Sequence, residues 1–262
     1  MYLICMKGYY NMDLTSPRTI RNIQEQFGFT FKKGLGQNFL TARNILEEIV
    51  DAAEIESGVI EVGPGFGVLT SELAQNSDKV VTIEIDERLI DVLDYTLAEY
   101  DNVKIINEDI LKLDLTKVID DEFNGEKVSI AANLPYYITT PIITKLLEEK
   151  LPIKNIVVMV QKEVAERMSA KPSTKDYGAI TVLCQYYTEP SIVANVPASL
   201  FVPPPKVDSA VLKLKVLDKP SVEVKDEGVF FRVVKAAFSQ RRKTLLNCLS
   251  ANFPIPKDEI ST

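Results

Sequence analysis

Five apolar runs alternate with amphipathic stretches between residues 58 and 161, and this alternation limits the possible folds more than any other feature of the sequence. The runs lie at Gly58–Gly63, Lys79–Ile85, Asn102–Asn107, Lys127–Asn133 and Ile153–Gln161. Near-continuous Val and Ile runs are typical of parallel strands buried on both faces, with helices formed by the stretches between them. The pattern therefore predicts an α/β fold with a mostly parallel sheet.

Two further strand-like segments, residues 189–196 and 209–217, follow without a long helix between them. We expect them to form an antiparallel strand pair at one edge of the sheet. Residues 221–253 are predicted to be helical, with a basic middle. We accordingly expect an N-terminal extension at residues 1–30, a main domain at residues 31–219 and a small helical domain at residues 220–262.

The 262-residue chain contains no histidine, which excludes Ser-His and Cys-His nucleophile pairs and imidazole acid–base catalysis. Its three cysteines are far apart and lack metal-type spacing, so we expect no metal and a reducing, cytoplasmic environment. No apolar run is long enough to span a bilayer, and no signal peptide is predicted. Chemistry must therefore depend on carboxylates, amides, lysines, tyrosines or a cofactor.

The net charge of -7 is unevenly distributed along the chain. Residues 1–149 contain 13 Lys and Arg against 26 Asp and Glu, a net charge of -13. Residues 150–262 contain 17 against 11, a net charge of +6. A polyanion would therefore bind the second part of the chain, although surface lysines that merely aid solubility explain the same count.

A glycine-rich loop, EVGPGFG, directly follows the first predicted strand. Its glycines Gly63, Gly65 and Gly67 allow a sharp turn into a helix and a close approach of the backbone to a ligand. The spacing is G-x-G-x-G and not the dinucleotide pattern G-x-G-x-x-G, which favours S-adenosylmethionine over NAD. A tight turn with no ligand remains the alternative.

Acids follow the next two predicted strands, at Glu84 and Asp109. At the carboxyl end of a parallel strand, about 20 residues after a glycine loop, an acid can accept from both ribose hydroxyls, as we expect of Glu84. Asp109 is placed to accept from an adenine amino group. Either acid could instead cap a helix. With the loop, these acids predict a Rossmann-like S-adenosylmethionine-dependent methyltransferase sheet.

The fourth strand ends in the sequence NLPY, which begins at Asn133. The side-chain oxygen of Asn133 and a backbone carbonyl at Leu134 or Pro135 could both accept from an aromatic amine and stabilise the charge that develops as it is methylated. Pro135 fixes the turn, and Tyr136 offers a flat face for a flipped base. A simple turn that ends a strand is the alternative.

Four segments of the chain, GLGQNFL, EVGPGFG, NLPYYI and FVPPPKVDSAVL, together resemble the ribosomal RNA adenine N6,N6-dimethyltransferases, and within that family the small-subunit (16S) branch. The resemblance runs from about Phe31 to Leu249. It implies methyl transfer from S-adenosylmethionine to two adjacent adenines in a hairpin near the 3' end of the small-subunit rRNA, with the assembling 30S subunit as partner and a monomeric enzyme. Family members usually continue with further helices, so the C-terminal domain is expected to be incomplete.

The resemblance also implies roles for individual residues, with Asn133 touching both cofactor and target amine. The cofactor would be held by Asn38, Leu40, Gly63, Gly65, Glu84, Asp109 and Asn133. Tyr136 and Phe201 would cover the two faces of the target base. RNA phosphates would be met by Lys32, Lys33, Arg241, Arg242 and Lys243, although for each group solvated or ion-paired side chains are the alternative.

Three rival functions remain open on the sequence. A large-subunit rRNA adenine methylase that confers macrolide resistance shares the fold and many motifs, but it tends towards Ser before Gln and Ile before Pro in the corresponding segments. A ribosome-assembly factor would keep the site and act mainly by docking on RNA. An NAD dehydrogenase is disfavoured by the glycine spacing and by the absence of histidine.

Overall fold

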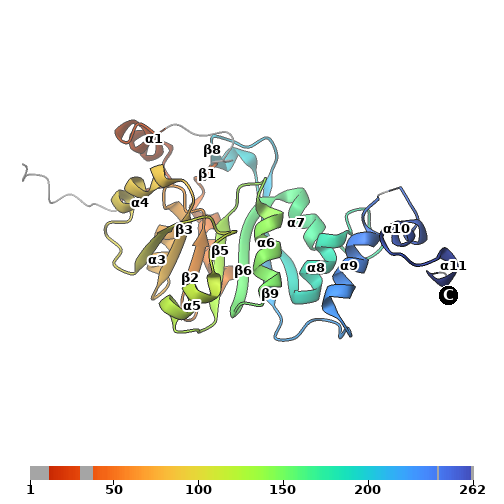
Figure 1. Ribbon diagram of the computed structural model, residues 1–262. Helices are drawn as coiled ribbons and strands as arrows, with labels where there is room; N and C mark the ends of the chain where they lie inside the picture. The colour runs from red at the N-terminus through yellow and green to blue at the C-terminus, as the bar shows by residue number, and fades with distance from the viewer. Residues whose placement is uncertain (1–11, 30–37, 241, 261–262) are drawn as a thin grey trace, which may run out of the picture.

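The predicted strands form a sheet at the centre of the molecule. The computed structural model describes residues 12–29, 38–240 and 242–260 (Figure 1). The sheet contains β2 (Val59–Val62), β3 (Val80–Glu84), β4 (Val103–Asn107), β5 (Val128–Asn133), β6 (Ile153–Gln161), β7 (Thr188–Val196) and β9 (Ser209–Val216). Their order is β4-β3-β2-β5-β6-β9-β7, and neighbouring strands from β4 to β6 are parallel. The predicted mostly parallel sheet is confirmed.

Helices cover both faces of the sheet because successive side chains of a strand point to opposite sides. In β6, Ile156 and Val158 pack into one hydrophobic core, whereas Val157 and Met159 pack into the other. The first core includes side chains of α5 (Leu115–Phe123), α6 (Thr139–Glu148), α7 (Lys162–Met168) and α8 (Ala179–Tyr187). The second includes side chains of α1 (Pro17–Gln26), α2 (Arg43–Ala53), α3 (Val68–Gln75), the 3-10 turn η2 (Glu87–Leu89) and α4 (Ile90–Thr96).

The predicted antiparallel edge is also confirmed. β9 is antiparallel to both β6 and β7 and lies between them. Between β7 and β9 the chain forms the 3-10 turn η3 (Ala198–Leu200) and the short strand β8 (Phe201–Val202). β8 pairs antiparallel with β1 (Phe39–Leu40), so a segment near the N-terminus is tied to the segment that follows β7.

The C-terminal part of the described chain contains α9 (Glu227–Ala237), α10 (Leu245–Asn252) and α11 (Lys257–Ile260). α9 lies beside α8, and α10 and α11 follow it at the end of the molecule away from β4 (Figure 1). Aromatic rings join α9 to α8: Tyr186 and Phe230 have ring centroids 5.2 Å apart, and Tyr187 stacks on Phe231 at 5.8 Å. These contacts fix the direction in which the C-terminal helices leave the sheet. The division into domains at residue 220 stays a prediction.

Two properties of the described chain concern cofactors and membranes. Across residues 12–29, 38–240 and 242–260, no group of three or more His, Cys, Asp or Glu side chains is arranged to hold a metal ion. Within the same ranges, every helix is too short or too polar to cross a bilayer.

Candidate active site

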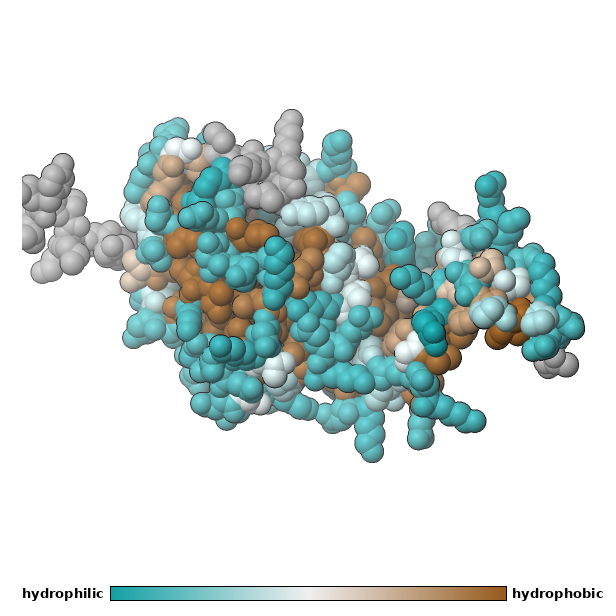
Figure 2. Space-filling model, in the orientation of Figure 1, coloured by the Kyte–Doolittle hydropathy of each residue, from teal (hydrophilic) through white to brown (hydrophobic). Residues whose placement is uncertain are grey.

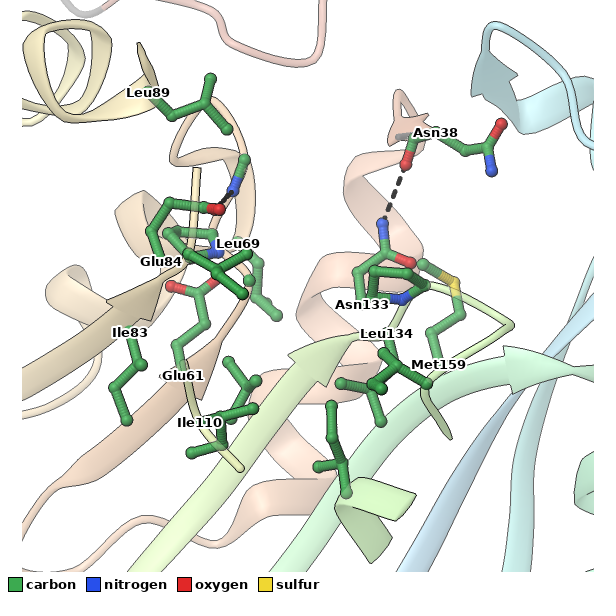
Figure 3. Close-up of a pocket in the computed structure, with 18 of the residues that line it drawn as sticks. Asn38, Glu61, Leu69, Ile83, Glu84, Leu89, Ile110, Asn133, Leu134 and Met159 are labelled. Carbon is green, nitrogen blue, oxygen red and sulfur yellow. Dashed lines mark hydrogen bonds between the residues drawn. The ribbon is translucent and has the colours of Figure 1, made fainter. Parts of the chain in front are cut away.

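A cavity of about 310 Å³ opens at the carboxyl ends of β2, β3 and β5. This edge of a parallel sheet is where open α/β folds bind ligands, because the strand-to-helix loops converge there. In the space-filling view, apolar side chains gather over the strands between α4 and α6 (Figure 2). Figure 3 shows the polar groups that project into the cavity from β3 and β5 and from the residue preceding β1.

Most residues that the sequence singles out for a site come together around this cavity. Its lining includes Asn38, Leu40, Gly63, Gly65, Glu84, Asp109, Asn133, Pro135 and Tyr136. They come from five different loops or strand ends that are spread along the chain. The structure therefore brings together side chains that are far apart in the sequence.

The glycine loop between β2 and α3 uses its glycines in two different ways. Gly63 has φ +71°, and a Cβ added there would meet nothing within 4 Å, so its backbone faces open space at the cavity wall. Gly65 has φ +61°, and a Cβ there would lie 2.8 Å from Cε1 of Phe39. The ring of Phe39 in turn stacks on Phe66 at 4.3 Å. Gly63 therefore leaves room for a ligand, whereas Gly65 leaves room for an aromatic side chain.

Glu84, the last residue of β3, places its carboxylate against the glycine loop. Oε1 accepts the backbone N–H of Asp86 at 2.8 Å, and Oε2 accepts that of Gly65 at 3.4 Å (Figure 3). Burial raises the pKa of Glu84 above its ordinary value, while these two N–H groups oppose the rise because they stabilise the charged form. Each carboxylate oxygen retains further acceptor capacity toward the cavity.

Asp109 lies two residues beyond the end of β4, in the turn that leads to α5. Its Oδ1 accepts the N–H of Leu111 at 3.0 Å, and Oδ2 is 3.8 Å from the ammonium group of Lys112. Oδ1 therefore closes a turn at residues 110–112 and does not cap α5, whose N-cap is Asp114. Because Asp109 also lines the cavity, this turn and a ligand contact are compatible.

The side-chain amide of Asn133 is held in one orientation by a residue that is 95 positions earlier in the sequence. Its Nδ2 donates to the backbone oxygen of Asn38 at 3.1 Å (Figure 3). A carbonyl oxygen can only accept, so the group that faces Asn38 must be the NH₂ group. Oδ1 of Asn133 is consequently turned the other way, and it has no hydrogen-bond partner among the residues that the structure describes.

Tyr136 and Tyr137 follow Asn133 in the same turn but differ in their surroundings. The hydroxyl of Tyr136 is hydrogen-bonded to Oγ of the fully buried Ser209, at the start of β9, with a distance of 2.7 Å. Tyr137 is 59% exposed, and both rings line the cavity. The hydroxyl of Tyr136 is therefore fixed by a hydrogen bond, whereas Tyr137 lies exposed at the rim of the cavity.

Six of the predicted contacts lie away from the cavity or outside the described residues. Phe201 is 3% exposed, packs in the second core and does not line the cavity, because its pairing with Leu40 in the β1–β8 sheet turns it inward. Lys32, Lys33 and Arg241 lie outside the described residues, and their RNA contacts stay predictions.

The basic segment at residues 242–243 corrects one expectation. Arg242 and Lys243 lie in the connection between α9 and α10, so the prediction that a helix carries them is wrong. The reason is local: the side chain of Thr244 accepts the N–H of Asn247 and starts a new helix at Leu245. Both basic side chains are exposed.

Comparison with known proteins identifies the family of this chain. Residues 28–261 match the family model described as "Ribosomal RNA adenine dimethylase". The chain belongs to this family. It is 55% identical over 251 residues to "Ribosomal RNA small subunit methyltransferase A" of Bacillus mycoides (strain KBAB4) and of Bacillus cereus (strain B4264), which covers 94% of this chain and 86% of each relative.

Two solved structures share the adenine dimethylase fold with this chain. A dimethyladenosine transferase from Plasmodium falciparum is 33% identical, with a TM-score of 0.65 over 80% of this chain and 74% of that chain. The 23S rRNA methyltransferase ErmE is 30% identical, with a TM-score of 0.65 over 82% of this chain and 85% of that chain. The family resemblance and the fold class predicted from the motifs are confirmed.

Several cavity residues of this adenine dimethylase had no role predicted from the sequence, among them Glu61, Ile85 and Tyr137. Ile85 is 57% exposed although it directly follows a buried strand. Its position between two acids, Glu84 and Asp86, could have indicated that it lies at the site. Tyr137 was visible as the second tyrosine of NLPYY. Glu61 was not recognised, because it lies inside a predicted strand and not at a strand end, where the sequence analysis looked for acids.

Glu61 is a buried acid in the middle of β2. Its Oε2 accepts the hydroxyl of Thr70 at 2.5 Å, and its side chain lines the cavity. Burial raises the pKa of Glu61 to about 8; the hydrogen bond from Thr70 opposes this rise, and the nearby charge of Glu84 adds to it. Near neutral pH, a large fraction of Glu61 is therefore protonated in the folded protein.

The substitution Glu61→Gln should flatten the pH dependence of stability. Between about pH 4.5 and pH 8 the folded state keeps a proton that the unfolded state releases, so the free energy of unfolding falls as pH rises, by at most about 1.4 kcal/mol per pH unit. Glutamine removes this slope. Denaturant unfolding across this range should show that the free energy of unfolding of E61Q rises relative to that of the parent as pH increases. Parallel curves of unfolding free energy against pH would contradict the raised pKa of Glu61. Glu56→Gln, which alters an exposed ion pair with Lys154, is the control.

Proposed function

We propose that this protein transfers methyl groups from S-adenosylmethionine to N6 of two adjacent adenines in a hairpin near the 3' end of small-subunit (16S) rRNA. The products are N6,N6-dimethyladenosine and S-adenosylhomocysteine. Family membership and the 55% identity to small-subunit methyltransferases support the reaction and the substrate class. The observation that carries the proposal is the Asn133 amide, fixed with its oxygen unpartnered at the cavity.

The cavity fits S-adenosylmethionine in size and in chemistry. Its volume of about 310 Å³ lies in the range of small-molecule sites, and its apolar lining and two strand-end acids suit a nucleoside. In this proposal Glu84 accepts from the ribose hydroxyls and Asp109 from the adenine amino group, while the open backbone at Gly63 faces the methionine part. Asn38, Leu40 and Gly65 complete the wall. When bound, the cofactor supplies an electrophilic methyl group on a sulfonium centre.

The target amine needs two hydrogen-bond acceptors, and the turn after β5 supplies them. Oδ1 of Asn133 is the first. The carbonyl of Pro135 already accepts the N–H of Ile138 at 3.1 Å and the hydroxyl of Thr139 at 3.2 Å. The carbonyl of Leu134 is therefore the better second acceptor, and Pro135 serves to fix the turn.

These two acceptors draw the N6 nitrogen away from conjugation with the ring and stabilise the positive charge that develops on it. The nitrogen lone pair forms the new N–C bond as the C–S bond breaks. The resulting ammonium then loses a proton to water. No side chain has to remove a proton before transfer, which is consistent with a chain that has no histidine.

Tyr136 is proposed to stack on the flipped adenine, and two substitutions separate its ring from its hydroxyl. Tyr136→Ala should lower kcat/KM for small subunits about tenfold or more, because stacking contributes about 1–3 kcal/mol per base. Tyr136→Phe keeps the ring and loses the bond to Ser209, so we expect a loss of no more than a few fold. Equal losses in steady-state assays of the two variants would contradict stacking as the main role.

Arg242 and Lys243 are proposed, with Lys32, Lys33 and Arg241, to contact rRNA phosphates. In the described residues, Arg242 and Lys243 are exposed and form no ion pair. The double variant R242A/K243A should bind rRNA more weakly and reduce the slope of log affinity against log salt by about two units. An unchanged slope in a filter-binding titration would show that Arg242 and Lys243 do not contact rRNA phosphates.

The proposal is tested by methyl transfer from labelled S-adenosylmethionine to small subunits purified from cells that lack this protein, with large subunits and naked rRNA as controls. Label in N6,N6-dimethyladenosine on small subunits alone is expected. Label on large-subunit RNA would move the assignment to the resistance methylases. Cofactor binding without transfer would favour a ribosome-assembly factor. We also propose that the enzyme acts as a monomer in the cytoplasm.

A further inference from the structure

We propose that Tyr137 holds the nucleotide next to the target adenine, by stacking on its base at the rim of the cavity. This inference rests on the proposed function, in which two adjacent adenines are methylated in turn. It gives each of the two consecutive tyrosines a separate base: Tyr136 takes the adenine in the site, and Tyr137 takes its neighbour.

The position of Tyr137 is the first argument. It lines the same cavity as Asn133 and Tyr136, so a base on its ring is within one nucleotide of the reacting amine. The turn that carries it is firmly built, because the N–H of Ile138 and the hydroxyl of Thr139 both bond to the carbonyl of Pro135. Tyr137 is thus an exposed ring on a fixed backbone.

The second argument is that Tyr137 has no structural task in the described part of the chain. Its hydroxyl makes no hydrogen bond there, its ring contacts no other aromatic ring, and 59% of the residue is exposed. Tyr136 differs on two of these points, since its hydroxyl is tied to Ser209, 73 residues later, and the residue is only partly exposed. A ring with no hydrogen bond and no aromatic contact in the described fold, on a residue that lines a ligand site, is available for the ligand.

The third argument concerns the substrate. When one adenine leaves the RNA stack, its neighbour loses a stacking partner, and this unstacking costs a few kcal/mol. An aromatic face at the rim replaces that partner and recovers most of the loss. The two adenines are adjacent, so whichever one occupies the site, the other is close enough to reach the rim.

The test compares Tyr137→Ala, Tyr137→Leu and Tyr137→Phe on two substrates. The first is small subunits with both adenines, and the second is small subunits from cells whose rRNA carries uridine at one of the two positions. A uridine offers a smaller face for stacking. We expect Y137A and Y137L to lower kcat/KM about tenfold on the first substrate and no more than about threefold on the second. Y137F should behave as the parent on both.

Affinity for S-adenosylhomocysteine, measured on the same variants, reports on folding and on the cofactor site. It should stay within twofold of the parent. An equal loss on both substrates, a full effect of Y137F, normal activity of Y137A or a large loss of cofactor affinity would each overturn the role of Tyr137. Failure of the parent enzyme to methylate small subunits would instead overturn the proposed function, so the two failures are distinguishable.

Discussion

Replacing Asn133 with alanine is expected to lower kcat for methyl transfer by at least about 10²–10³-fold, the usual result of removing a single side chain that stabilises developing charge. The variant loses the oxygen that accepts from the target amine and the N–H that bonds to Asn38. Cofactor affinity should fall no more than a few fold, because Glu84 and the glycine loop remain. Single-turnover transfer to small subunits and calorimetric titration with S-adenosylhomocysteine measure the two effects separately.

Two companion variants sharpen this test. Asn195→Ala removes an exposed amide from β7, outside the cavity, and should keep near-parental activity. Asn133→Asp keeps an acceptor but cannot donate to the Asn38 carbonyl, so we expect activity between those of the parent and N133A. Turnover of N133A within threefold of the parent would eliminate the assigned role.

Glu84→Gln is expected to weaken cofactor binding about 10²-fold. A carboxylate can accept from two ribose hydroxyls while it also accepts the N–H groups of Asp86 and Gly65. Glutamine replaces one acceptor oxygen by a donor, and a hydrogen bond to a charged group contributes about 1.5–3 kcal/mol. At saturating cofactor, kcat should return to within a few fold of the parent value.

Titration with S-adenosylmethionine and a kcat measurement over a wide cofactor range check this result. Glu87→Gln is the matched control, since Glu87 is an exposed acid three residues further along that does not line the cavity. If E84Q bound the cofactor as well as E87Q does, the ribose would have to be held by another group.

The sheet and the strand-end residues were predictable because each depends on local sequence. Val and Ile runs report buried strands directly, and the carboxyl ends of parallel strands must meet at one edge. This is enough to bring Gly63, Glu84 and Asn133 to one cavity without any knowledge of distances. The antiparallel edge followed from the lack of a long helix between residues 196 and 209.

Other features of the site depend on contacts between distant segments, which no local pattern reports. The bond between Asn38 and Asn133 joins residues 95 positions apart. The burial of Phe201 follows from its pairing with Leu40, and the raised pKa of Glu61 follows from what packs around β2. The helix break at Arg242 was missed for a different reason: the cap at Thr244 is a local signal that the basic run obscured.

The β1–β8 pairing links the orientation of the Asn133 amide to the position of the chain segment that carries Asn38. This sheet has only two residues per strand, reinforced by the bonds of Thr41 to the Leu200 carbonyl at 2.9 and 2.8 Å and by the packing of Leu40 and Phe201 in the second core. If this pairing opened, the carbonyl of Asn38 would move away, and the amide of Asn133 could then rotate and present a donor to the amine. On the proposed roles, a ligand that contacts Asn38 and Leu40 favours the closed arrangement and, with it, the reactive rotamer. Catalysis would then depend on the order of binding. An adenine that binds before the cofactor would meet an Asn133 amide that is not yet in the reactive orientation.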